Sequence, residues 1–111
     1  MSLSVSPATP GFQDVRPTTV ASHLADLRLV DVREPHEFAT GRIAGAESVP
    51  LATVIEAAAG WDRSRPMLLI CRSGNRSGRA AAALAGMGFS NLLNLAGGML
   101  AWEAEGLPVE R

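Results

Sequence analysis

The chain has a single cysteine, no lysine and almost no net charge. Its single cysteine, Cys71, cannot form an internal disulfide, and a free thiol suits a reducing compartment. All of its basic residues are arginine, so an arginine at any one position says nothing about a preference over lysine. Ten arginines against eleven Asp plus Glu give a formal charge of −1. Such a balance provides no overall field for attracting nucleic acid or a membrane surface.

Long apolar stretches are absent too. No run approaches the length of about 18 residues that a membrane-spanning helix needs. The N-terminus lacks the basic start and apolar stretch of a secretory signal. We therefore expect a cytoplasmic protein that binds neither nucleic acid nor membrane. At 111 residues, 47% of them apolar, the chain fits one domain, placed at residues 12–111 behind a flexible Ser- and Pro-rich tail at residues 1–11.

The sequence is most informative around Cys71. This residue follows the apolar run Met67-Leu68-Leu69-Ile70, which predicts a buried strand, and precedes an Ala-rich run at residues 79–87, which predicts a helix. Cys71 is thus expected where a strand stops and a helix is about to begin. The first N–H groups of a helix have no partner within it and favour an anion. A thiol placed there ionises more easily, and the thiolate is the nucleophilic form.

The residues that follow Cys71 strengthen this prediction. A helix end contributes up to about 2 kcal/mol, and one pKa unit corresponds to about 1.4 kcal/mol, so the helix alone lowers the thiol pKa by about one unit. Arg72 and Arg76 are predicted to lower it further. Gly74 and Asn75 can adopt the left-handed backbone angles that turn successive N–H groups inward around an anion. The alternative is that Cys71 is simply a small buried hydrophobe.

Strands and helices alternate along the rest of the chain. Strands are predicted at residues 12–15, 28–32, 67–70 and 91–95, with a very short one just before Pro50. Helices are predicted at residues 17–27, 35–40, 51–59, 79–87 and 99–105, the last with Leu100 and Trp102 facing inward. The alternation predicts an α/β fold: a single parallel sheet of about five strands with helices on both faces. Ligand sites in such sheets lie at the carboxyl ends of the strands, where Cys71 is expected.

Three other polar residues are possible functional groups. Asp31 ends a predicted strand, and we expect it to bind a nearby arginine or a backbone N–H group rather than to catalyse. His36 has no cysteine or second histidine at metal-ligand spacing, so no metal site is predicted. Glu37 is expected to cap its helix or to form a surface ion pair.

Three separated motifs make the chain similar to the single-domain rhodanese family of sulfurtransferases. They lie at residues 31–46, 71–77 and 95–109, and the resemblance extends from about Phe12 to Val109. One departure is Arg42, where the family usually has histidine; the position belongs to a structural motif, so we expect no loss of chemistry. The resemblance implies a rhodanese-like fold, and we expect neither a metal nor a cofactor.

The resemblance also implies a two-step transfer of sulfane sulfur. Cys71 would attack the outer sulfur of a donor such as thiosulfate, release sulfite and become a persulfide. A second nucleophile, namely cyanide, a small thiol or a protein cysteine, would then remove that sulfur. The N–H groups of the loop would stabilise the anionic sulfur. The anionic donor would be held by Arg72 and Arg76, with Arg33 as a less favoured third candidate. The substrate-binding residues expected in the loop are Arg72, Ser73, Gly74, Asn75, Arg76 and Ser77.

Two alternatives remain open from the sequence. Cysteine phosphatases place five residues between cysteine and arginine to surround a phosphate, whereas four residues separate Cys71 from Arg76 here. No acidic group that could protonate an alkoxide leaving group is evident near the loop. The other alternative is a non-catalytic rhodanese-like module that only docks partners. Such modules usually lack the cysteine, which this chain retains.

Overall fold

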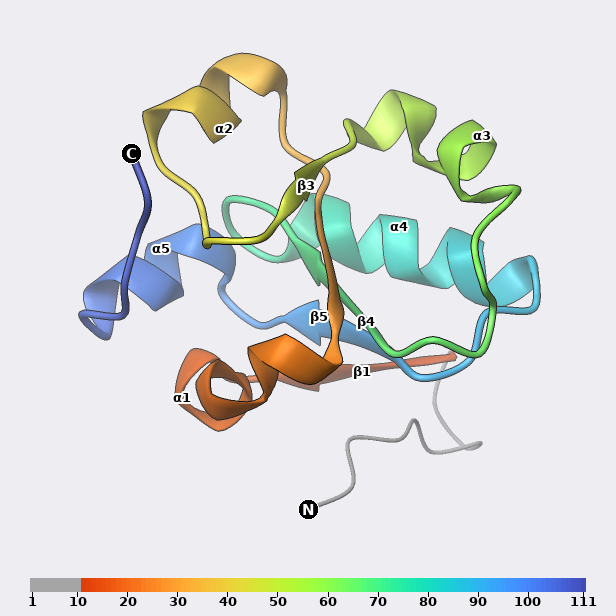
Figure 1. Cartoon of the computed structure of the whole chain (residues 1–111), viewed down its shortest axis with the longest axis horizontal. Helices are drawn as coiled ribbons and strands as arrows, with labels where there is room; N and C mark the ends of the chain where they lie inside the picture. Colours follow the sequence, from red (N-terminus) through yellow and green to blue (C-terminus); the bar gives the residue numbers. More distant parts are fainter. Residues whose placement is uncertain (1–10) are drawn as a thin grey trace.

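The computed structural model describes residues 11–111, so the tail predicted at residues 1–11 lies, apart from Gly11, outside the described residues. Five strands form a sheet in the order β1-β5-β4-β2-β3, and all neighbouring pairs are parallel (Figure 1). The strands are β1 Phe12–Val15, β2 Arg28–Asp31, β3 Glu47–Ser48, β4 Met67–Ile70 and β5 Leu92–Leu95. The predicted α/β fold with one parallel, five-stranded sheet is confirmed.

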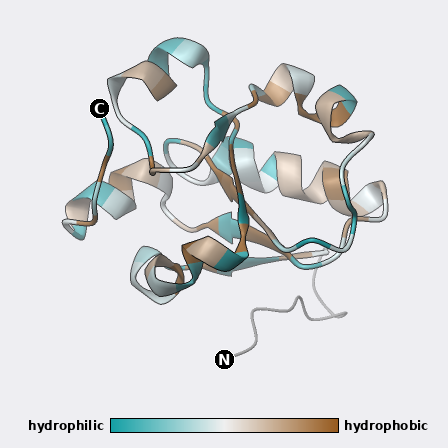
Figure 2. Cartoon of the chain, viewed as in Figure 1, coloured by the Kyte–Doolittle hydropathy of each residue, from teal (hydrophilic) through white to brown (hydrophobic). Residues whose placement is uncertain are grey.

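Side chains alternate along β4 and enter two cores on opposite faces of the sheet. Met67 and Leu69 pack on the face covered by α3 (Val54–Ala58) and α4 (Asn75–Gly86). Leu68 and Ile70 pack on the face covered by α1 (Pro17–Val20) and α5 (Gly98–Ala104). All four side chains are fully buried, and β4 is brown in Figure 2. Burial on both faces is the reason that this strand is a continuous apolar run.

The helical segment that starts at Pro17 differs from the prediction. Pro17 begins α1, where its missing N–H group is tolerated, but the α-helix ends at Val20. A 3₁₀ helix, Ala21–Asp26, follows, and Leu27 is already extended, with φ −120° and ψ 146°. Leu27 is buried, and its extended backbone leads directly into β2. The predicted helix at residues 51–59 is likewise a 3₁₀ turn, Leu51–Thr53, followed by α3.

One inward-facing residue of the last helix was predicted wrongly. Trp102 is buried, as expected, but Leu100 is 49% exposed. Met99 and Trp102 lie three residues apart and therefore share the face of α5 that packs on the sheet, whereas Leu100 is rotated by about 100° from Met99. The Nε1–H group of Trp102 donates to the carbonyl of Pro108 at 2.8 Å, which ties the C-terminal segment to α5.

The carboxyl ends of the strands meet at one edge of the sheet. Asp31 lies beside Ile70 in the register of β2 and β4, and Leu69 lies beside Asn94 in that of β4 and β5. Helix α2 (Pro35–Thr40) follows the end of β2, and the loop after β4 begins with Cys71. Among residues 11–111, no helix combines the length and apolar character needed to cross a membrane.

Candidate active site

The loop that contains Cys71 connects β4 to α4. Gly74 is the N-cap of α4 and has φ +98°, a left-handed conformation that favours glycine. The helix starts at Asn75, four residues before the predicted start at residue 79. Residues 75–77 therefore form the first turn of the helix rather than a free loop. The expectation that Cys71 faces the start of a helix is met, with the helix closer than predicted.

Two donors point at the sulfur atom of Cys71. The N–H group of Gly74 lies 3.1 Å from Sγ, and the hydroxyl oxygen of Ser77 lies 3.2 Å from it. Cys71 itself has 0% exposure, so in this conformation the sulfur is enclosed beneath the loop. Ser77 is equally buried, whereas Ser73 and Asn75 lie on the exposed rim of the loop.

These contacts change the acidity of the thiol. Burial is the strongest single influence and raises the pKa of Cys71, but hydrogen bonds from the Ser77 hydroxyl and from the backbone of Ser77, Gly74 and Ser73 outweigh it. The pKa of the thiol is consequently lowered from its ordinary value. The main causes of the lowering are thus hydrogen bonds rather than the two guanidinium groups expected from the sequence: Arg72 is exposed, and Arg76, although it interacts with the charge of Cys71, is bound to Glu37.

The orientation of the loop is set from the opposite side by α5. The N–H group of Met99 donates to the carbonyl of Cys71 at 2.9 Å, and that of Leu100 donates to the carbonyl of Arg72 at 3.0 Å. Free N–H groups at the start of α5 thus bind the outward-facing carbonyls of the loop. The approach is so close that Gly98 has no room for a side chain.

Arg76 is bound to α2. Its two terminal nitrogens donate to the two carboxylate oxygens of Glu37 at 2.7 and 2.8 Å, in a bidentate pair that is partly buried. Glu37 also accepts the N–H group of Glu34 at 3.0 Å and so completes the capping box of α2. The ion pair therefore joins the first turn of α4 to the first turn of α2.

This ion pair predicts a specific pH dependence of stability. Hydrogen bonds from the Arg76 guanidinium, with a smaller contribution from the Glu34 N–H group, lower the pKa of Glu37 from 4.5 to about 2. Because the folded-state pKa is the lower one, the pair contributes stability above pH 4.5 that is lost as the pH falls towards 2. Urea unfolding across this range should show a smaller loss of stability for Glu37→Gln and for Arg76→Met than for the wild-type chain. If the free energy of unfolding falls equally steeply with pH in all three proteins, the prediction is contradicted.

The structure does not bring Arg33 into the loop. Its guanidinium forms a bidentate pair with Asp31, with a shortest distance of 2.7 Å, and donates to the carbonyl of Gly41 at 2.8 Å. Both side chains are buried. Asp31 thus binds a nearby arginine, as expected from the sequence, and together they hold the turn at Gly41 against the end of β2.

Within the described part of the chain, Arg72, unlike Arg33 and Arg76, is not bound to a carboxylate. None of the ion pairs formed among residues 11–111 includes it. It lines a cleft of about 250 Å³ between α2 and α5, together with Arg33, His36, Glu37, Thr40, Met99, Leu100 and Glu103. Of the three arginines named from the sequence, Arg72 is the one placed to meet an anionic ligand without first leaving a carboxylate.

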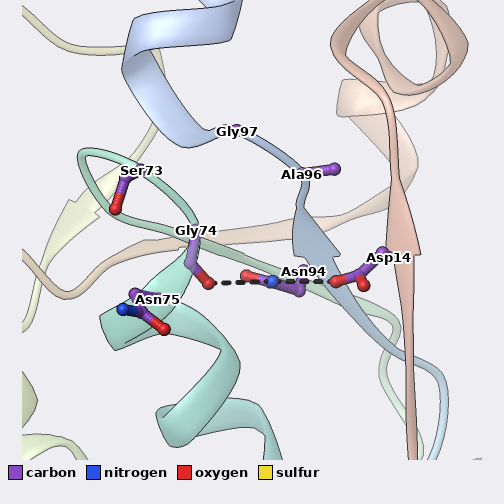
Figure 3. A pocket seen from close by; sticks show the side chains of 7 residues that line it. All are labelled: Asp14, Ser73, Gly74, Asn75, Asn94, Ala96 and Gly97. Atoms are coloured by element: carbon purple, nitrogen blue, oxygen red, sulfur yellow. Dashed lines mark hydrogen bonds between the residues drawn. The ribbon is translucent and has the colours of Figure 1, made fainter.

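Asn94 is a polar residue beside the loop that the sequence patterns did not single out. It lies in β5, is 5% exposed, and donates from Nδ2 to the carboxylate of Asp14 at 2.9 Å and to the carbonyl of Gly74 at 3.1 Å (Figure 3). Its Oδ1 accepts from the hydroxyl of Ser77. A single polar residue within the buried strand Leu92–Leu95 was the available signal. Asn94 also lines a second pocket, of about 330 Å³, on the β1–β5 side of the loop.

Metal coordination has no basis in the described region. Within residues 11–111, no three His, Cys, Asp or Glu side chains gather where they could hold an ion. His36 is exposed. The groups that do lie around the loop are a buried thiol, hydrogen-bond donors and guanidinium groups.

The fold and the position of the Cys71 thiol can be compared with known families. The family model described as "Rhodanese-like domain" matches residues 16–105 of the chain. The chain belongs to this rhodanese-like family.

Individual relatives agree with that assignment. A protein of Allochromatium vinosum named "Sulfurtransferase" is 39% identical over 76% of this chain and 78% of its own length. A protein of Pseudomonas putida named "Thiosulfate sulfurtransferase GlpE" is 40% identical over 68% of this chain and 69% of its own. The crystal structure of a rhodanese-related protein from Thermoplasma volcanium has a TM-score of 0.82 and 30% identity, covering 88% of this chain and 97% of that one. For two other relatives the chain spans 45% and 60% of their length.

Proposed function

We propose that this chain is a sulfurtransferase that carries sulfane sulfur as a persulfide on Cys71. The thiolate attacks the outer sulfur of a donor such as thiosulfate, the S–S bond of the donor breaks, and sulfite leaves with the bonding electron pair. A nucleophilic acceptor, namely cyanide or a thiol, including that of a partner protein, then attacks the outer sulfur and regenerates the thiolate. The observation that carries the proposal is the pair of donors on Sγ, at 3.1 and 3.2 Å.

The site supplies two kinds of stabilisation for this chemistry. The N–H group of Gly74 and the hydroxyl of Ser77 lie beside the sulfur before reaction, and the backbone N–H group can hold negative charge there without any rearrangement. Arg72, beside the α2–α5 cleft, is our candidate for binding the anionic donor. Ser73 and Asn75 are exposed on the rim of the loop, and Arg76 would have to leave Glu37 before it could bind a sulfur donor.

The four-residue spacing between Cys71 and Arg76 and the Arg76–Glu37 pair both weigh against a cysteine phosphatase. A phosphatase arginine has to face the phosphate inside the loop, whereas Arg76 donates both terminal nitrogens to a carboxylate of α2. The docking module is the stronger alternative, because Cys71 has no exposed surface. A sulfur donor can reach the sulfur atom of Cys71 only when the residues on the rim of the loop move aside.

The intact mass of the protein distinguishes these functions. After incubation with thiosulfate and removal of excess reagent, the wild-type chain should gain the mass of one sulfur atom, and cyanide should remove it with formation of thiocyanate. Cys71→Ser should show neither change, and as the chain has no other cysteine it is a complete control. Absence of any gain, with thiosulfate and with a small organic persulfide, would favour the docking module. Hydrolysis of a phosphate ester without a mass gain would favour the phosphatase.

A further inference from the structure

The amide of Asn94 has its orientation fixed by two acceptors. Asp14 presents a carboxylate oxygen at 2.9 Å and Gly74 a carbonyl oxygen at 3.1 Å, so the side of the amide that faces them has to be the N–H₂ group (Figure 3). Oδ1 consequently points the other way, to the hydroxyl of Ser77. An amide oxygen can accept a hydrogen bond but cannot donate one.

Ser77 therefore lies between two acceptors. Its oxygen is within hydrogen-bond distance of Oδ1 of Asn94 and, at 3.2 Å, of the sulfur of Cys71. A hydroxyl group has a single hydrogen and can serve one of these acceptors at a time. Ser77 has 0% exposure, so bulk water does not readily supply the missing donor.

The two protonation states of the sulfur use this hydrogen differently. In the thiol, S–H donates to the Ser77 oxygen, whose own hydrogen goes to Asn94, and all three groups are satisfied. In the thiolate, the Ser77 hydrogen is needed at the sulfur, which leaves Oδ1 of Asn94 without a donor and facing the lone pairs of the Ser77 oxygen. A buried acceptor deprived of its hydrogen bond is unfavourable.

We infer that Asn94 is a positioning residue that competes with Cys71 for the single hydroxyl hydrogen of Ser77, and so holds the resting sulfur towards its neutral form. The inference deepens the proposed function, since it concerns the reactivity of the same sulfur. Once Cys71 carries a second sulfur, the negative charge lies on the outer atom and the Ser77 hydrogen returns to Asn94. Asn94 thereby favours the loaded state over the free thiolate.

Charged groups elsewhere around the site act on the same equilibrium and have to be held constant. Arg76 of α4 interacts with the charge of Cys71 and is itself paired with Glu37 of α2. Asp14 of β1 lies beyond Asn94, and the buried Asp31–Arg33 pair follows β2. Arg72 in the loop and Glu103 of α5 line the adjacent cleft. All of these side chains are retained when only Asn94 and Ser77 are varied.

The test is a double-mutant cycle read by the pKa of Cys71. Thiolate absorbance in the far ultraviolet is followed against pH, without any sulfur donor, for the wild-type chain, Asn94→Leu, Ser77→Ala and the double variant. Leucine keeps the approximate shape of asparagine, and Asn94→Ala is the second variant if leucine unfolds the chain. We expect Asn94→Leu to lower the pKa of Cys71 by about one unit, the size of one hydrogen bond, and to have no effect when Ser77 is already alanine.

Two results would overturn the inference. One is a pKa that stays constant or rises in Asn94→Leu, and the other is a fall of equal size in the Ser77→Ala background, which would indicate general loosening of the loop. Asp14→Asn is the matched control: it removes the nearby negative charge but keeps an oxygen that orients Asn94, and should shift the pKa much less. The pKa measurements use no sulfur donor, so a negative result in the double-mutant cycle is distinct from a negative result in the mass-gain experiment, which tests the proposed function itself.

Discussion

Replacing Gly98 with alanine is expected to abolish most sulfur loading and to destabilise the fold. A Cβ atom at this position would lie 2.5 Å from the carbonyl carbon and oxygen of Arg72 and from the carbonyl oxygen of Cys71. These are backbone atoms, so they cannot move aside without moving the loop. The backbone of Gly98 also has φ +58°, which costs a residue with a side chain about 1–2 kcal/mol, while overpacking costs about 1–3 kcal/mol.

The functional loss follows from the hydrogen bonds at the start of α5. Displacing the loop weakens the bonds from Met99 to the carbonyl of Cys71 and from Leu100 to that of Arg72, and these bonds keep the loop amides directed at the sulfur. Loss of one preorganised donor slows comparable reactions by about a hundredfold or more, and we expect a decrease of that size in the rate of sulfur loading, measured by intact mass against time.

Gly86→Ala provides the matched control. Gly86 ends α4 and is not among the residues with positive φ, and a Cβ atom added there would meet no other atom within 4 Å. The same substitution should raise stability there by up to about 1 kcal/mol and leave sulfur loading unchanged. If Gly98→Ala retains wild-type loading and an unchanged urea midpoint, the loop is not held by its close approach to α5.

The fold and the position of Cys71 could be predicted from the sequence because both follow from local patterns. The apolar run of β4, the glycines after the helices and the alternation of elements are each properties of neighbouring residues. The helix start at Asn75 was not predicted because the helix-forming run begins only at Arg79, and the left-handed Gly74 lets the helix start earlier. Leu100 was misplaced because apolar character alone does not fix the angular position of a residue on a short helix.

The partners of the site residues were not predictable in the same way. Arg76 binds Glu37, 39 residues away, and Asn94 binds Asp14, 80 residues away. Such contacts depend on which strands are neighbours, and the order β1-β5-β4-β2-β3 is a property of the whole sheet. The sequence therefore predicted where Cys71 and its loop lie in the fold, whereas the hydrogen bonds that fix Ser77 and the arginines required the tertiary structure.

Replacing Asp31 with alanine is expected to destabilise the fold by about 3–5 kcal/mol. Asp31 is fully buried, Arg33 is 5% exposed, and the carboxylate accepts from both the backbone and the guanidinium of Arg33. Removing one member of a buried pair leaves the other as an uncompensated charge, for which the carbonyls of Gly41 and Glu37 are incomplete substitutes. The midpoint of urea unfolding, at constant m-value, measures the change.

Two comparisons show whether the burial of the Asp31–Arg33 pair, rather than ion pairing as such, causes the loss of stability in Asp31→Ala. Arg28 and Glu47 also form a bidentate pair, at 2.8 and 3.0 Å, but the Glu47 side chain is 44% exposed, so Glu47→Gln should cost no more than about 1 kcal/mol. The double variant Asp31→Leu with Arg33→Met removes both buried charges and should recover much of the stability lost in Asp31→Ala. If Asp31→Ala costs no more than Glu47→Gln, the pair at the end of β2 contributes nothing beyond a surface contact, and the turn at Gly41 has to be held in place by packing alone.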